Sequence, residues 1–95
     1  MIAPIRPLFA LGHLVATHIA LQAFAESGDN PAHFIARHQC GDWGDLDEHD
    51  KRENNLSVKR GFRILSSYRL KNNTKVWIIT EADRSSTTIL LPEEY

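Results

Sequence analysis

The sequence predicts an α+β fold, in which two or three N-terminal helices pack on a three-stranded antiparallel β-meander. Helix-type apolar spacing and capping residues occupy the first half of the chain, and apolar β-branched runs occupy the last third. At 95 residues the chain has the size of one domain with a small core. We therefore treat 1–95 as a single α+β domain.

The N-terminal part predicts one helix. Residues 1–7 contain two prolines, and we expect a flexible lead-in there. The apolar stretch Leu8–Ala16 is compatible with a short strand or with the first turns of a helix. Thr17 is a good N-cap, and the apolar spacing after it predicts a helix from His18 to about Glu26. Gly28 should end this helix, because glycine adopts the left-handed cap conformation without steric cost.

Two further helical segments follow. Asn30-Pro31 predicts a helix start, with Asn as cap and Pro at the first helical position, and the helix should stop before Gly41. Asp47 caps the stretch Asp47–Arg60, which Gly61 closes. That stretch is very polar, so it is either an exposed helix or a partly ordered segment.

The C-terminal third predicts the sheet. Strand-type runs cover Phe62–Leu70, Lys75–Glu81 and Thr87–Leu91. The turn at 71–74 and the polar link at 81–86 are short enough to make neighbouring strands antiparallel. An open edge strand of this sheet could pair with another copy of the chain.

The predicted core is apolar and aromatic. Its members are Leu21, Phe24, Phe34, Ile35, Trp43, Phe62, Ile64, Tyr68, Trp77, Ile79, Ile89 and Leu91.

Composition excludes several classes of protein. The 11 Lys and Arg nearly balance the 12 Asp and Glu, so no overall positive charge favours non-specific binding to nucleic acid or to a membrane surface. No apolar stretch approaches the roughly 20 residues of a membrane span. The single Cys40 excludes an internal disulfide and fits a reducing compartment. We expect no signal peptide and a cytoplasmic location.

Three groups could carry metal or thiol chemistry. His38, Cys40 and Asp42 could begin a metal site, but structural zinc needs paired ligand spacings that the chain lacks. Cys40 could act as a nucleophile with His38 or His49 as base, although no feature marks an oxyanion hole. The carboxylates of 42–48 do not follow the calcium-loop pattern. We expect neither a metal nor another cofactor, and whether His38, Cys40 and Asp42 bind a metal stays open.

The polar link between the last two strands is the preferred site region. Glu81, Asp83 and Arg84 could form a small hydrolase-type site together with His38 if the carboxyl pKa values were split by their surroundings. The alternative is an ordinary surface turn with a weak ion pair. Catalysis therefore stays undecided.

Binding to a macromolecule is the other hypothesis. Trp43 is either a core plug or an exposed anchor for a partner. The predicted protein-binding surface consists of Asp42, Trp43, Asp45, Glu81, Asp83 and Arg84. A nucleic acid could instead bind the basic segment through Lys51, Arg52, Lys59 and Arg60, although solvated Lys and Arg are also common at strand edges.

Three motifs resemble a known family. Gly41–Asp47, Trp77–Ser85 and Leu91–Tyr95 resemble small bacterial proteins labelled "plasmid-related protein" or "type I restriction endonuclease subunit M", and the resemblance covers roughly 11–95. The chain departs from the family pattern at Thr17-His18, where Thr-Pro is expected, and at Asn72-Asn73, where Asp-Gly is expected.

The methyltransferase label does not fit the residues. The chain lacks a Gly-rich loop for the methyl donor and an Asn/Asp-Pro-Pro-aromatic motif for the target base. The resemblance implies an interaction protein of bacterial mobile elements, linked to defence or anti-defence, with a bacterial protein as partner.

Overall fold

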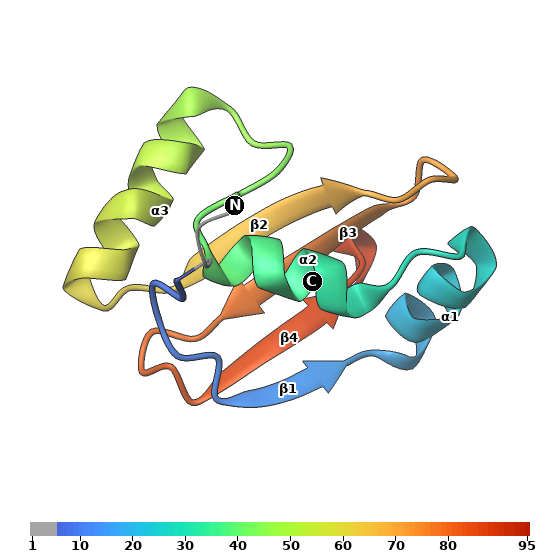
Figure 1. Ribbon diagram of the computed structural model, residues 1–95, viewed down its shortest axis with the longest axis horizontal. Helices are drawn as coiled ribbons and strands as arrows, with labels where there is room; N and C mark the ends of the chain where they lie inside the picture. Colours follow the sequence, from blue (N-terminus) through green and yellow to red (C-terminus); the bar gives the residue numbers. More distant parts are fainter. Residues whose placement is uncertain (1–5) are drawn as a thin grey trace, which may run out of the picture.

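The computed structural model describes residues 6–95 and combines three α-helices with a four-stranded sheet (Figure 1). Residues 1–5 of the predicted flexible lead-in lie outside the described part. In chain order the elements are β1 (His13–Ala16), α1 (His18–Ser27), α2 (Pro31–Gln39), α3 (Glu48–Arg60), β2 (Ile64–Arg69), β3 (Lys75–Thr80), β4 (Ser86–Leu90) and the 3-10 turn η1 (Pro92–Glu94). The α+β class is confirmed.

The predicted helix ends are confirmed. Thr17, Asn30 and Asp47 each accept a hydrogen bond from a backbone amide of the first helical turn, at 2.8–3.0 Å. Gly28 and Gly61 end α1 and α3 in the left-handed conformation, with φ of 78° and 75°. These ends depend on contacts within a few residues, which is why sequence reasoning finds them.

The sheet is mixed, which corrects the predicted three-stranded meander. The strand order is β1-β4-β3-β2, and the two pairs among β2, β3 and β4 are antiparallel as predicted. β1 adds a fourth strand parallel to β4, with Leu14 opposite Thr87. Leu8–Ala16 therefore contains a strand, whose partner lies more than 70 residues later in the chain.

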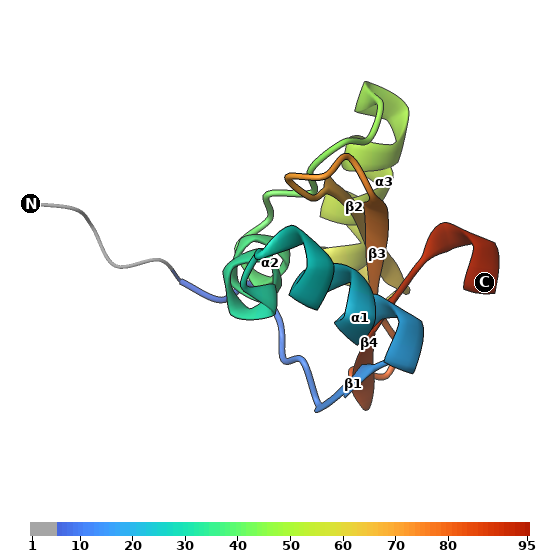
Figure 2. The ribbon, with the colours of Figure 1, turned by 90° about the vertical axis from the view of Figure 1, so that its right-hand side faces the viewer.

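Helices α1 and α2 cover one face of the sheet (Figure 2). The main core lies between them and the strands and includes Phe24, Phe34, Tyr68, Ile78 and Ile89. A smaller cluster of Phe9, Trp43 and Ile64 extends this core.

Two core predictions are wrong, and two others are only partly buried. Leu21 of α1 is 50% exposed, and Phe62, which precedes β2, is 53% exposed. Ile35 and Trp77 are half-buried. Leu21 has Gln22 as its neighbour on the solvent side of α1, whereas Ala20 and Phe24 face the sheet.

The outer edge of β2 is closed by side-chain and loop contacts. The Asn54 amide of α3 bonds both backbone groups of Leu65, at 2.7 and 3.2 Å. The amide of Ser67 donates to the carbonyl of Trp43, and the carbonyl of Ser67 accepts from the amide of Asp45. These contacts fix α3 and the loop before it beside the sheet.

Candidate ligand-binding groove

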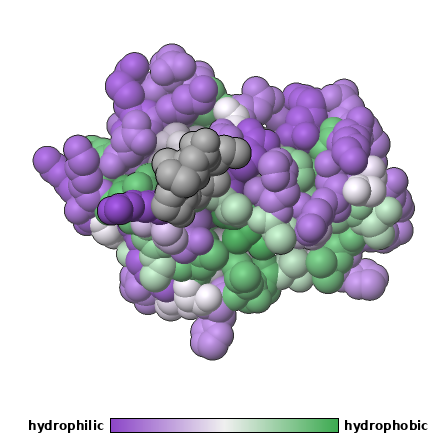
Figure 3. Space-filling view, in the orientation of Figure 1, coloured by the Kyte–Doolittle hydropathy of each residue, from purple (hydrophilic) through white to green (hydrophobic). Residues whose placement is uncertain are grey.

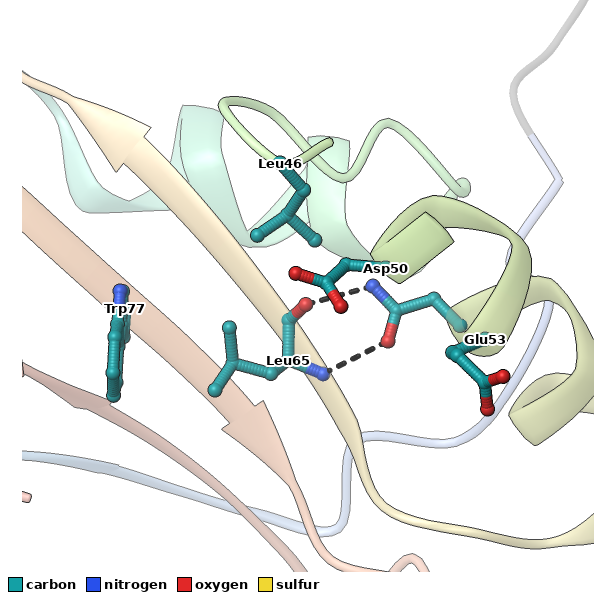
Figure 4. Close-up of a pocket in the computed structure, with 6 residues that line it drawn as sticks. Leu46, Asp50, Glu53, Leu65 and Trp77 are labelled. Atoms are coloured by element: carbon teal, nitrogen blue, oxygen red, sulfur yellow. Dashed lines mark hydrogen bonds between the residues drawn. The ribbon is translucent and has the colours of Figure 1, made fainter. Parts of the chain in front are cut away.

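A groove of about 320 Å³ lies between α3 and the sheet (Figure 4). Its lining comes from the loop before α3, from α3 itself and from strands β2 and β3. The lining residues are Leu46, Asp50, Glu53, Asn54, Leu65 and Trp77.

The floor of the groove is apolar. Leu65 follows Ile64 in β2, and Trp77 precedes Ile78 in β3. Ile64 and Ile78 are fully buried on the helix-covered face. Because successive strand residues point to opposite faces, Leu65 and Trp77 belong to the other face, where both remain half-buried. In Figure 4 the side chain of Leu65 points toward the Trp77 ring.

The position of α3 depends on a tight backbone approach. Gly44 adopts φ of 77°, and a Cβ there would lie 2.1 Å from the carbonyl oxygen of Ser67. Glycine therefore lets the loop run along β2, and Leu46 then leads into the rim of the groove. The two hydrogen bonds between the Asn54 side chain and the backbone of Leu65 hold α3 at this distance.

The wall of the groove is acidic. Asp50 and Glu53 are three residues apart on α3, so they lie on the same side of the helix. Asp50 makes no ion pair with any described residue. Glu53 lies 4.0 Å from His49, an exposed histidine that carries charge only when protonated. In Figure 4 the Asp50 carboxylate is directed toward the Leu65 side of the groove, whereas the Glu53 carboxylate is directed away from Trp77. Asp50 is thus the carboxylate that borders the aromatic floor without an ion pair to a described residue.

This arrangement suits a cationic, partly apolar group. An indole ring attracts cations through its negative face, and carboxylates pair with guanidinium or ammonium groups. The apolar floor adds favourable burial for the aliphatic part of a Lys or Arg side chain. The volume lies at the lower end of the range for small-molecule pockets, so one or two side chains fill it.

His38 is part of a buried hydrogen-bond chain and is not a surface base. It is 0% exposed, its Nδ1 lies 2.5 Å from Ser66 Oγ, and its Nε2 lies 2.9 Å from Thr80 Oγ1. Thr80 Oγ1 lies 2.7 Å from Thr87 Oγ1, and Thr87 donates to the carbonyl of Leu11.

The end of this chain determines each proton position. Because Thr87 donates to Leu11, its oxygen is left to accept from Thr80, and Thr80 in turn accepts from His38. The proton of His38 is therefore on Nε2, and Nδ1 accepts from the Ser66 hydroxyl. Burial lowers the pKa of His38 from 6.5 to about 4, in agreement with a neutral ring.

The proposed hydrolase residues do not form one accessible site. His38 has both ring nitrogens engaged inside the protein. Arg84 donates to four carbonyl oxygens, including those of Ser57 and Phe62, and so ties the turn to the end of α3. The pKa of Asp83 lies below its usual value mainly because its carboxylate accepts a hydrogen bond from the Ser85 hydroxyl. A second hydrogen bond, from the Ser85 amide, lowers that pKa further.

The predicted protein-binding surface is divided. The loop that carries Asp42, Trp43 and Asp45 lies near Ser67 of β2. The turn that carries Glu81, Asp83 and Arg84 lies near Phe62, which precedes the other end of β2. Trp43 is only 3% exposed, and its indole N–H donates to Asn55. Trp43 is therefore the core plug that the sequence suggested, and it offers no exposed anchor.

The acidic loop residues are already paired. Asp42 lies 2.6 Å from Arg37, whose hydrogen bond is the main cause that lowers the pKa of Asp42. Asp45 lies 3.4 Å from Arg69. Glu81 keeps a half-buried position, and its carbonyl accepts from Arg84.

The candidate metal ligands lie at the end of α2 and in the loop after it, and the basic segment lies on α3. Between residues 6 and 95, no three or more His, Cys, Asp or Glu side chains are grouped so that they could hold a metal ion, and His38, Cys40 and Asp42 therefore form no such group. Lys51, Arg52, Lys59 and Arg60 all lie on α3. Glu48, Asp50 and Glu53 surround the first two of them in the sequence, and the other two occupy the last turn of the helix. No described helix has the length and apolar character of a membrane span.

Sequence reasoning missed the groove. Trp77 was assigned to the core, although strand alternation places it on the same face as Lys75 and opposite to the buried Ile78. The spacing of Asp50 and Glu53 could have indicated a shared helix face. Nothing in the sequence indicates that this helix face meets Trp77.

Comparisons of the chain with protein-family models, with curated proteins and with solved structures found no match.

Proposed function

We propose that the protein is a non-enzymatic binding module whose groove holds a basic, partly apolar segment of a protein partner. One observation carries the proposal: the half-buried indole of Trp77 shares a groove with the unpaired carboxylate of Asp50 and with Glu53. The family resemblance suggests that the partner is a bacterial protein met by a mobile element.

Arginine is the basic residue that fits this groove best. Its planar guanidinium can stack on the indole of Trp77 and still bond a carboxylate with its edge, whereas an ammonium is a more strongly hydrated point charge. Apolar neighbours of the arginine would lie on Leu65 and Leu46. Lys75 lies on the same face as Trp77, toward the β2–β3 turn, so the attraction for a cation is confined to the α3 side.

A binding role also agrees with the position of the groups that could do chemistry. His38 is enclosed, Arg84 is bonded to carbonyl groups, and Asp42 is paired with Arg37. The groove itself contains carboxylates but no histidine, cysteine, serine or threonine.

The test is a titration with a panel of short peptides in which one Arg is flanked by apolar residues at different spacings. Each peptide has a partner in which citrulline, a neutral group of similar shape, replaces Arg. We expect some Arg peptides to bind about 3- to 10-fold more tightly than their citrulline partners, because citrulline loses the charge attraction to the exposed carboxylates and the cation–π contact with Trp77.

Matched variants show whether the groove is responsible. Asp50→Asn combined with Glu53→Gln should remove the preference for Arg over citrulline. Glu48→Gln changes a carboxylate in the same first turn of α3 that does not line the groove, and it should leave binding unchanged. Absence of binding across the panel, or equal binding of Arg and citrulline peptides, would overturn the proposal.

A further inference from the structure

The two edges of the sheet differ in how their backbone groups are used. At the β2 edge, Asn54 bonds Leu65, and the loop through Trp43 and Asp45 bonds Ser67. β1 forms the opposite edge, and no described element lies beyond it in Figure 1 or Figure 2.

Two residues of β1 direct their backbone groups outward. In the pairing with β4, the amides of His13 and Thr17 donate to the carbonyls of Ser85 and Ile89, each at 3.0 Å. Because alternate residues of a strand bond to opposite sides, Leu14 and Ala16 present their N–H and C=O groups away from β4. These groups are positioned to bond another strand.

The exposed edge is apolar on both faces. Leu14 is 55% exposed on the helix-covered face, and Val15 is 49% exposed on the other face. Ile19, in the first turn of α1, is 51% exposed. In Figure 3 hydrophobic surface gathers between α2 and β1, whereas the surface over α3 is hydrophilic. Sheet edges that stay solvated usually carry Lys, Pro or a bulge, and β1 has neither Lys nor Pro.

We propose that a second copy of this chain pairs with β1 in antiparallel orientation, so that one sheet continues through both copies. When a strand pairs with a second copy of itself, side chains of like charge can come to lie opposite each other and repel. β1 contains no Asp, Glu, Lys or Arg, so its pairing with a second copy avoids this repulsion. A two-fold axis makes the contact self-complementary and closed. The dimer is independent of the groove, which lies at the opposite, β2 side of the sheet.

The outward groups select the register. When Val15 lies beside Val15 of the second copy, Leu14 lies opposite Ala16 of that copy, and all the outward backbone groups of these two residues are bonded. The two Val15 side chains then form a non-hydrogen-bonded pair, in which Cα atoms approach to about 4.5 Å.

Sedimentation analysis over a concentration series that reaches the millimolar range tests the dimer. Wild-type protein should reach twice the monomer mass. Leu14→Pro should stay monomeric, because it removes an outward N–H that the β4 pairing does not use. Leu14→Thr keeps that N–H and should dimerise, although more weakly. A wild type that stays monomeric, or a folded Leu14→Pro that dimerises like the wild type, would overturn the proposal.

Cross-linking tests the register without relying on the proline variant. In a Cys40→Ser background, Val15→Cys should form an inter-chain disulfide under mild oxidation, because the expected Cα separation suits one. His13→Cys lies on the same face but opposite Thr17 of the second copy, so it should remain reduced. Cross-linking that is equal at both positions, or absent at position 15, would contradict the proposed pairing.

Discussion

His38 lies at the centre of a chain of side-chain hydrogen bonds in which each proton has one position. Protonation of the ring would turn Nδ1 into a donor that faces the Ser66 hydroxyl, and it would place a charge in the core. The lowered pKa of His38, about 4, follows from its burial. Its role is to satisfy polar groups between α2 and the sheet.

The first prediction concerns pH. In the unfolded chain His38 binds a proton near pH 6.5, whereas in the folded protein it does so only near pH 4. Between these values the unfolded state binds the extra proton, so the free energy of unfolding should fall by roughly 1.4 kcal/mol for each pH unit of acidification. Urea unfolding at several pH values between about pH 6 and about pH 4.5, inside this window, measures the slope.

Two variants separate His38 from the other histidines. His33→Gln changes an exposed ring and should keep the slope. His38→Leu should lower stability at neutral pH and flatten the slope, since Ser66 and Thr80 lose their partner. A His38 ring that titrates near 6.5 in the folded protein by NMR would contradict the assignment.

The second prediction concerns the end of the same chain. Thr87→Val keeps the shape of the side chain but leaves the Leu11 carbonyl and the Thr80 hydroxyl without their partner, so we expect a loss of about 1–3 kcal/mol. Thr88→Val, at the neighbouring half-buried position on the other face of β4, should change stability by less than about 0.5 kcal/mol. Thermal unfolding of both variants provides the comparison, and equal losses would argue against the hydrogen-bond chain.

At the scale of elements, sequence reasoning succeeded where the determining contacts are local. Thr17, Asn30 and Asp47 were identified as caps because a cap bonds an amide two or three residues away. The sequence does not decide between strand and helix at Leu8–Ala16, because β4, the partner of the strand at His13–Ala16, lies near the other end of the chain. The contact of Asn54 with Leu65 was missed for a related reason, since a polar residue within a polar helix gives no sign that it is 6% exposed.

The third prediction concerns the loop that positions α3. Gly44→Ala should cost more than Gly28→Ala, although the two glycines have nearly equal φ, of 77° and 78°. A Cβ at Gly28 meets nothing within 4 Å, so that variant pays only the left-handed backbone cost of roughly 1–2 kcal/mol. A Cβ at Gly44 would collide with the backbone of Ser67 and should add about 1–3 kcal/mol. Urea unfolding of both variants measures the difference, and equal losses would show that the loop can move away from β2 at no cost.

At the scale of the whole molecule, the groove exists because a loop, a helix and two strands meet. Leu46 belongs to the loop before α3, Asp50 and Glu53 to α3, and Leu65 and Trp77 to two strands. Each of these residues has an ordinary local explanation in the sequence: Leu46 precedes the helix cap, Asp50 is an acid of the first helical turn, and Glu53 is a polar residue of a polar helix. Leu65 and Trp77 are apolar residues of strands. These residues line one groove only because α3 packs against the β2 edge. The sequence does not indicate this packing, and it therefore points to other residues for the site.

The same packing separates the two tryptophans. Trp43 is buried and donates its indole N–H to Asn55, whereas Trp77 is half-buried in the groove floor. The two indole N–H signals therefore report on the core and on the groove, respectively, in one unmodified protein.

The most direct test of the binding account is an NMR titration of the wild-type protein with the tightest Arg peptide of the panel, with indole signals assigned from a Trp77→Phe variant. The account predicts that the Trp77 indole N–H signal and the Leu65 amide signal shift together along one saturation curve, while the Trp43 indole signal stays in place. The citrulline partner peptide should leave all three signals nearly unchanged. A peptide that binds while the Trp77 and Leu65 signals stay unmoved would contradict the account, because the ligand would then occupy another surface.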